Sequence, residues 1–255
     1  MGYDDFKIDA NEPFDHLPDA PIVEAVIHWQ AVPEAELEQK WFRDQLEPLL
    51  EGYAEPQVQR KLNFGGKFDT TGKTSLHQTD DWHGFRIPSK DESCVAQFTR
   101  EGFALSHLKP YTNWEQFKSE AVRLWEVYCK IAKPSEVQRL GVRFINQIGP
   151  VNLSSLGDLL TVVPASPKYM PLPLKGFMHQ SRFDVPGHPY NLNVIQTIPA
   201  ATKSDSVSLI LDFDVFTTRA IQIQEIDDRL QQMHWIKNKA FFSFLTADAI
   251  GRYKE

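Results

Sequence analysis

The stretch Val207-Ser-Leu-Ile-Leu-Asp-Phe-Asp-Val-Phe216 alternates apolar and polar residues, and a long amphipathic segment follows it. Such alternation predicts a strand with one buried face, and apolar residues at helical spacing from about Gln224 predict a helix. The same order, a strand followed by a helix, occurs earlier, in residues 94–132. This echo indicates that the chain contains two related α+β units.

The rest of the chain repeats one order of elements. The first half predicts a strand at 21–30, a helix opened by Pro33 and ended near Pro48, several strands at 60–108, and a helix from the capping box Thr112-Asn-Trp-Glu115 to Pro134. The second half predicts a strand at 137–148, a short helix at 153–160, and strands at 176–185, 190–198 and 207–216 before the closing helix. In this scheme residues 26–29 correspond to residues 142–145.

The order predicts an α+β fold with an internal duplication, in which helices pack on one face of a curved antiparallel sheet. By topology alone the fold is TATA-binding-protein-like or helix-grip-like, an analogy that carries no function. Residues 1–20 are acidic and lack periodicity, which is typical of an arm or a loosely attached tail. We expect residues 21–134 and 135–255 to form the two halves of one compact, pseudo-duplicated domain.

Composition narrows the classes of function. The formal net charge of −7 over 255 residues argues against a general electrostatic grip on nucleic acid. The sequence contains no run of 18 apolar residues, so we expect no transmembrane helix. The acidic N-terminus does not resemble a signal peptide. Cys94 and Cys129 fall in a predicted strand and a predicted helix, as buried thiols of a reducing compartment do. We therefore expect a cytoplasmic protein that does not contact membranes.

The motifs of catalysis and metal binding are missing. The segment from Gly66 to Thr74 looks like a phosphate loop, but five residues separate its glycines where the motif needs four, and no helix start follows. A hairpin tip is the better interpretation. The eight histidines are dispersed, with no pair at helical ligand spacing. The sequence predicts no catalytic residues, no metal site and no cofactor.

The sharpest candidates for binding are Asp212 and Asp214, which project from one face of their strand because they are two residues apart. The two carboxylates could hold a divalent cation or share a proton. Alternatively, they pair with Arg139 or Arg143 on the polar face of the strand at 137–148. The predicted ligand- or partner-binding face consists of Glu24, His28, Arg139, Arg143, Gln147, Asp212 and Asp214.

Several motifs resemble a sporadically distributed, uncharacterised family of bacterial proteins of about this length. The motifs are Leu17–Val26, Phe98–Ser106, Pro110–Phe117, Arg139–Asn146, Leu211–Phe216 and Lys237–Phe242. The resemblance covers nearly the whole chain. It implies no activity and no catalytic residues, and its patchy distribution implies a defence or mobile-element setting.

These observations favour a non-enzymatic binding or regulatory protein that acts through a protein partner. Two alternatives remain open. One is a small-ligand or metal-dependent enzymatic module that uses the polar sheet face, with the arginines binding an anion. The other is nucleic-acid binding through a saddle-like sheet, which the topology alone suggests and the acidic balance opposes. The oligomeric state stays open.

Overall fold

The computed structural model describes residues 6–68, 74–164, 167–199 and 207–254, with the backbone alone at 62–68 and 74–79. The tip of the expected hairpin, at 69–73, lies outside the described residues. The strands are β1 Ile22–Gln30, β2 Gln57–Phe68, β3 Thr74–Pro88, β4 Cys94–Thr99, β5 Gly102–Leu108, β6 Arg139–Val151, β7 Phe177–Asp184, β8 Tyr190–Ile198 and β9 Val207–Thr217. The α-helices are α1 Gln39–Leu46, α2 Trp114–Ala132, α3 Ile226–Phe244 and α4 Ala247–Gly251, with 3-10 turns at Glu47–Leu49, Leu153–Asp158 and Ile223–Glu225.

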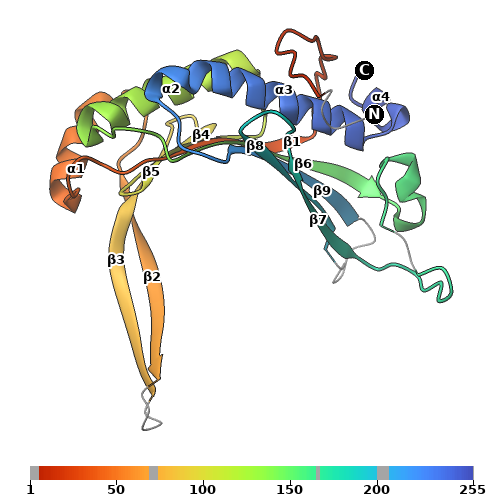
Figure 1. Cartoon of the computed structure of the whole chain (residues 1–255), viewed down its shortest axis with the longest axis horizontal. Helices are drawn as coiled ribbons and strands as arrows, with labels where there is room; N and C mark the ends of the chain where they lie inside the picture. Colours follow the sequence, from red (N-terminus) through yellow and green to blue (C-terminus); the bar gives the residue numbers. More distant parts are fainter. Residues whose placement is uncertain (1–5, 69–73, 165–166, 200–206, 255) are drawn as a thin grey trace.

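The nine described strands form one antiparallel sheet in the order β2-β3-β4-β5-β1-β6-β9-β8-β7. The expected α+β class is therefore confirmed, and strands of both halves belong to one continuous open sheet. The sheet is arched, and α1, α2 and α3 lie along its convex side (Figure 1). Helix α1 packs over β3, α2 over β1 and β5, and α3 over β6, β8 and β9.

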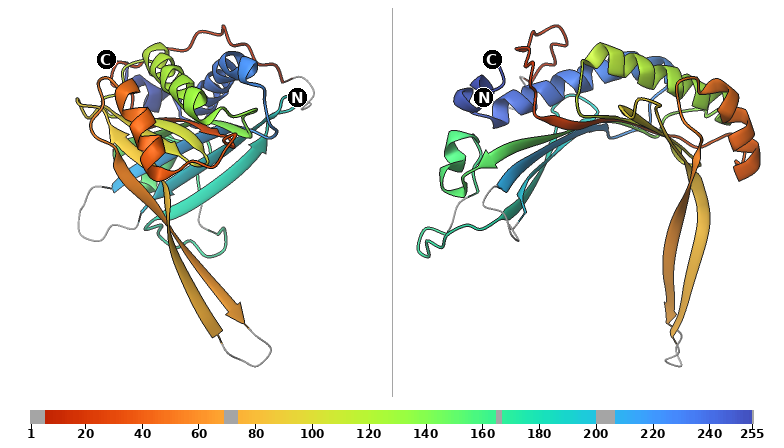
Figure 2. Two further views of the ribbon diagram at one scale, coloured as in Figure 1. Left: turned by 90° about the vertical axis from the view of Figure 1, so that its left-hand side faces the viewer. Right: turned by 180° about the vertical axis from the view of Figure 1, so that it is seen from behind.

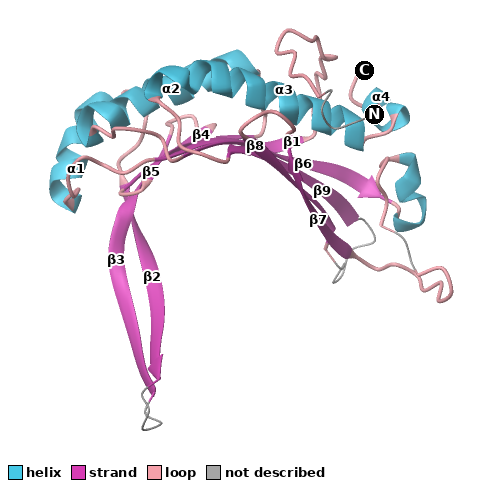
Figure 3. Ribbon diagram, in the orientation of Figure 1, coloured by secondary structure: helices cyan, strands magenta, loops and turns pink. Residues whose placement is uncertain are grey.

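The concave side of the arch is not covered by any helix in the described part of the chain (Figure 3). The hairpin of β2 and β3 projects beyond one end of the arch, as the two further views also show (Figure 2). Beyond the third pair from its base, Gln59 with Gly84, the strands of this hairpin pair only with each other, because β4 pairs with β3 solely at Gly84–Pro88. In the described residues, no helix has both the length and the apolar character needed to cross a membrane.

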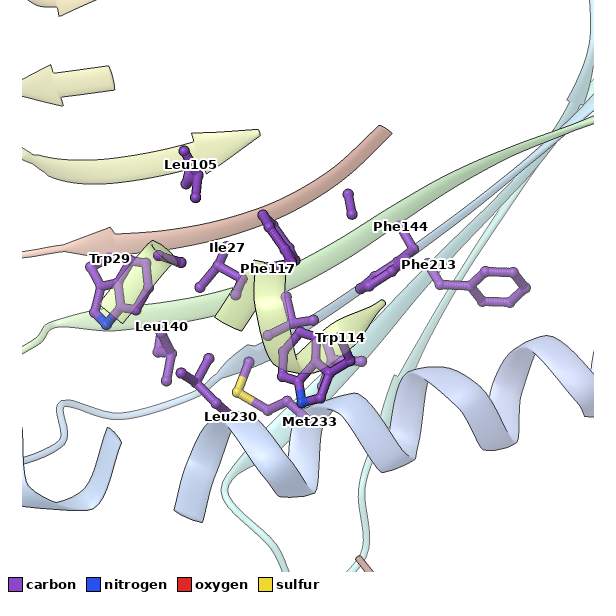
Figure 4. Packing of buried hydrophobic residues seen from close by; sticks show 14 of the residues in the cluster. Ile27, Trp29, Leu105, Trp114, Phe117, Leu140, Phe144, Phe213, Leu230 and Met233 are labelled. Atoms are coloured by element: carbon purple, nitrogen blue, oxygen red, sulfur yellow. The ribbon is translucent and has the colours of Figure 1, made fainter. Parts of the chain in front are cut away.

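The core lies between the sheet and the helices (Figure 4). In β1, Ala25, Ile27 and Trp29 are fully buried, as the alternation predicts. The Trp29 ring stacks on Trp125 of α2, with centroids 5.5 Å apart and planes 7° from parallel. A large apolar side chain such as Ile27 contributes roughly 1.5–3 kcal/mol to folding through the apolar surface that it removes from water. Because the core needs only one face of the sheet, the other face is free to carry polar residues.

β1 and β6 pair at the centre of the sheet, with Ile27 opposite Val142. The expected correspondence of residues 26–29 with residues 142–145 stays a prediction, and it would match partly exposed positions of β1 with buried positions of β6. Val142 is buried under the helices, whereas Val26, a neighbour of the buried Ile27, projects from the concave face. If buried residues of β1 are to correspond to buried residues of β6, the residue numbers of each corresponding pair must differ by an odd number.

The first helix begins later than its sequence predicts. Pro33 and the acidic residues after it precede the helix, and α1 starts only at Gln39. Its buried residues are Phe42 and Leu46, while Trp41 and Leu49 are exposed, so only part of its apolar residues face the core. The helix is short because it ends at a 3-10 turn that contains a proline. Few of its residues can therefore face the core.

The N-terminal segment is attached to the helices. Glu12 accepts hydrogen bonds from the Trp235 indole at 2.8 Å and from the Lys239 ammonium at 2.6 Å. Phe14 stacks on Phe242, with centroids 5.5 Å apart. Residues 6–20 therefore form an arm packed on α3, and the expectation of a loosely attached tail is wrong for them.

Candidate functional site

The predicted polar residues come together on the concave face of three neighbouring strands. Strands β1, β6 and β9 are adjacent, and in each of them the alternate residues are buried under the helices. The opposite face carries all seven predicted residues, which are Glu24 and His28 from β1, Arg139, Arg143 and Gln147 from β6, and Asp212 and Asp214 from β9. The register, with Arg143 opposite Asp214 and Ile145 opposite Asp212, places the two aspartates beside the arginines.

Asp212 and Asp214 each pair with an arginine. Arg143 binds Asp212 through two hydrogen bonds, of 2.8 Å from Nε and 2.5 Å from Nη2. Arg139 donates to Asp214 Oδ2 at 3.0 Å. Asp212 is buried, and its bond raises the pKa of Arg143. Because both carboxylates have fixed guanidinium partners, the ion-pair alternative describes their geometry.

His28 lies at the centre of this face and is uncharged. Burial, and then the charge of Arg139, lower its pKa to about 4. Arg139 Nη1 lies 3.4 Å from Nδ1 of the ring. Since a guanidinium only donates hydrogen bonds, Nδ1 accepts and the ring proton is on Nε2. His28 therefore offers a neutral N–H donor at neutral pH.

The guanidinium of Arg139 lies over the ring of Phe216, with Cζ 4.4 Å from the ring centroid. Arg182 of β7 lies over the same ring at 5.2 Å. Gly141 makes room for this arrangement, because a Cβ there would come within 2.7 Å of Arg139 Nη1. The contact with Phe216 and the bond to Asp214 together fix the arginine in one orientation.

A cavity of about 480 Å³ opens on the concave face between the strands of the two halves. Four of the predicted residues line it, namely His28, Arg139, Arg143 and Asp214. Glu24, Gln147 and Asp212 lie on the same face outside its walls. Burial raises the pKa of Asp214, and Arg139 offsets part of that rise. Within the described residues, no group of three His, Cys, Asp or Glu side chains has the arrangement of a metal site.

The polar face extends further than the sequence predicts. Side-chain hydrogen bonds join Gln59 of β2 to Gln97 of β4 at 3.1 Å, across β3. On the neighbouring strands β7 and β8 they join Gln180 to Asn193 at 2.9 Å and Arg182 to Asn191 at 2.9 Å. The alternation of Tyr190-Asn-Leu-Asn-Val194 carries a signal for two of these residues, since both asparagines fall on one face. The cross-strand partners could not be found, because the strand order brings them together.

Chemically, this face is a set of fixed donors and acceptors. Arg139 and Arg143 are paired with Asp214 and Asp212, His28 is neutral, and side-chain amides form hydrogen bonds across strands. Such a surface suits a ligand that offers both donors and acceptors, as a polypeptide does.

No protein-family model matches the chain, and no curated protein matches it. The candidate site therefore rests on its geometry.

Proposed function

We propose that the chain is a non-enzymatic binding or regulatory protein whose concave sheet face holds a protein partner. The observation that carries this proposal is the uncovered face itself, on which polar residues of β1, β6, β7, β8 and β9 are already hydrogen-bonded to one another. Residues fixed before binding lose little conformational freedom when a partner arrives. A preorganised, open and mixed-charge face is typical of protein recognition.

The pairing of the charges supports a polypeptide over a phosphate backbone. A nucleic-acid site needs arginines and lysines that are free to replace counterions. Arg139 and Arg143 are already committed to Asp214 and Asp212, at 3.0 and 2.5 Å. The same pairs weigh against a divalent cation between the two carboxylates, because a cation would have to displace both guanidinium groups.

Exposed apolar side chains next to the face supply candidate anchors. On the loop between Leu153–Asp158 and β7, Tyr169 is 91% exposed and Met170 is 56% exposed. Met178 of β7, on the concave face, is 75% exposed. Tyrosine and methionine are enriched at the centres of protein interfaces. The loop stands at the opposite end of the arch from the β2–β3 hairpin (Figure 1), so a partner in the arch lies between two projecting segments.

We also infer an internal duplication, which would make the sheet TATA-binding-protein-like. Two features support it. β1 and β6 meet at the centre of the sheet, and each is followed on its outer side by the strand that leads into a long helix, β5 before α2 and β9 before α3. The first half contributes one strand more than the second. Placement in the bacterial cytoplasm, and in a defence or mobile-element setting, remains a proposal that rests on the sequence resemblance.

The proposal is tested by using the tagged chain to capture partners from the native cell. The wild type is compared with one variant of the concave face and one control variant on the helix side. The concave variant combines Gln147→Arg with Met178→Asp, because both residues are exposed and make no core contact. Lys130→Glu, on the exposed side of α2, is the matched control. A stoichiometric protein that the wild type and the control capture, and the concave variant loses, is the expected result.

The same experiment separates the alternatives. Equal capture by the concave variant would overturn the assignment of this face. A captured species that nuclease removes, with duplex affinity that falls steeply as salt rises, would show the nucleic-acid alternative instead. Equal thermal midpoints of all three proteins establish that the variants are folded.

A further inference from the structure

A second cavity, of about 700 Å³, lies on the other side of the sheet and is separate from the concave face. The N-terminal arm forms its outer wall, and α3, the start of α2 and Asn146 of β6 form the rest. Its volume falls within the range of sites that hold small organic ligands. Aromatic residues of the arm and of both helices line it, including Phe14, Trp114 and Phe242.

Lys237 of α3 lines this cavity and is only 6% exposed. Its ammonium donates to Asn238 Oδ1 at 2.5 Å and lies 3.7 Å from the centroid of the Phe144 ring. Among the described residues, no carboxylate lies within ion-pair distance of it. Lysine is almost never fully buried without a paired charge, because the interior solvates an ammonium poorly. Burial accordingly lowers the pKa of Lys237 to about 7.

The acidic side chains around the cavity form ion pairs with lysines other than Lys237. Glu12 binds Lys239 and Trp235, Asp15 binds Lys254 at 2.7 Å, and Glu115 binds Lys118 at 3.6 Å. Lys237 is therefore the one cation among the described cavity residues that lacks a counter-charge. A ligand that enters this space meets an ammonium ready to take one.

A second buried polar group, from Tyr111, lines the cavity. The Tyr111 hydroxyl is buried and makes no hydrogen bond in the described structure. Its ring lies 5.4 Å from the ring of Phe144, the same ring that Lys237 contacts from α3. An unpaired buried hydroxyl costs about 1–3 kcal/mol, which a ligand acceptor can recover. An ammonium without a counter-charge and an unpaired hydroxyl thus belong to two side chains that contact the same ring beside the cavity.

We propose that this cavity binds a small organic acid with an aromatic or similarly flat apolar body, whose carboxylate pairs with Lys237 and accepts from Tyr111. The aromatic walls hold the body of the ligand. The stacked pair of Trp114 and His234, with centroids 4.2 Å apart, forms one such flat wall. The arm closes the site, since Glu12 and Phe14 fasten it to α3.

Binding in this mode takes up a proton above neutral pH. The carboxylate stabilises the ammonium, so the pKa of Lys237 rises in the complex and free lysine that was neutral becomes charged. The other titratable groups that face Lys237 are His234 on its own helix, Tyr111 and Glu115 at the start of α2, and Glu12, Asp15 and His16 of the arm. The sheet contributes the uncharged Asn146.

Calorimetry on the full chain tests the proposal with 3-phenylpropionate and 1-naphthoate as probes, and with the amide of each as the uncharged control. Lys237→Met removes the charge and keeps the length of the side chain, and Lys130→Met is the matched control on the surface. We expect at least tenfold weaker binding of the carboxylates to Lys237→Met, no such difference for the amides, and proton uptake at pH 8 in the wild type alone.

Equal carboxylate affinity in the wild type and Lys237→Met would overturn the proposal, as would the absence of binding by either acid at millimolar concentration. Tyr111→Phe, which keeps the ring and its packing, gives a second measurement should Lys237→Met fail to fold. It is expected to weaken the acids more than the amides. None of these results depends on the concave face, so the two proposals succeed or fail separately.

Discussion

At the scale of single residues, His28 links the concave face to pH. Its folded pKa of about 4 lies below the ordinary value of about 6.5, because the ring is buried beside Arg139. Between these two values the unfolded chain binds a proton that the folded chain does not. Stability conferred by the neutral ring is therefore complete above pH 6.5 and is lost as the pH falls toward 4.

His28→Gln should remove this dependence. Between pH 7 and 5.5 we expect the wild type to lose about 1 kcal/mol more unfolding free energy than the variant, as measured by urea titration at both pH values. His16→Gln, at an exposed histidine of the arm, is the matched control and should follow the wild type. Parallel losses in the wild type and His28→Gln would contradict a buried neutral imidazole.

The predictable part of the site is the choice of face. Alternation in three strands was enough to place Asp212, Asp214, Arg139 and Arg143 on one surface, because side chains two residues apart share a side. The pairing of Arg143 with Asp212, and the position of His28 beside Arg139, depend on strand order and register, which a single sequence does not encode locally. Lys237 sits at core spacing in its helix, so only the unusual placement of a lysine there could have signalled the second cavity.

At the scale of elements, the N-cap residue of α2 differs between the sequence prediction and the structure. The sequence predicts Thr112 as the capping residue, whereas Asn113 caps the helix and accepts from the Gln116 amide at 2.9 Å. The two residues are neighbours and both can cap a helix, so the backbone geometry decides between them.

Asn113→Ala should therefore lower the unfolding free energy by about 1 kcal/mol, because it leaves an amide of the first turn without its acceptor. Thr112→Ala, at the adjacent exposed position, should change it by less than about 0.5 kcal/mol. Chemical denaturation of the two variants beside the wild type measures the difference. A larger loss for Thr112→Ala would show that the capping box operates in solution.

Element type followed from sequence wherever periodicity was strong. The strand at 190–198 was predicted at its observed bounds, and the closing helix within two residues of its observed start, because alternation and helical spacing of apolar residues leave little ambiguity. The helix at α1 was predicted to be longer than it is. Acidic residues after a proline favour a helix start, but a helix need not begin there. Residues 60–108 were predicted only as several strands, and the long β3 was not distinguished among them, because its sequence shows no regular alternation.

At the scale of the whole molecule, the β2–β3 hairpin is a limb attached through its base. Its outer residues pair with each other, as Lys61 with Asp81 and Leu62 with Asp80, and β4 joins β3 only near the base. The strand pairs beyond the base extend the hairpin past the end of the arch, away from the core between the sheet and the helices (Figure 1).

Replacing residues 62–80 by Asn-Gly, a sequence that favours a tight hairpin turn after Lys61, should leave the unfolding free energy within about 1 kcal/mol of the wild type. The ion pair of Arg60 with Asp80 that is lost is exposed, and such pairs contribute little. Partner capture by this variant should weaken while its thermal midpoint is kept. A large loss of stability would mean that the limb supports the core.

The sheet is open, and its two outermost strands, β2 and β7, each have one side without a neighbour among the described strands. A backbone edge of this kind is a template on which any extended chain can add, so it is the place where an arch of this design would polymerise. β7 carries Arg182 and Asp184 and is mostly exposed along its length. Charges on an edge discourage a second copy from docking strand to strand, and that protection is what allows a wide sheet to stay unclosed.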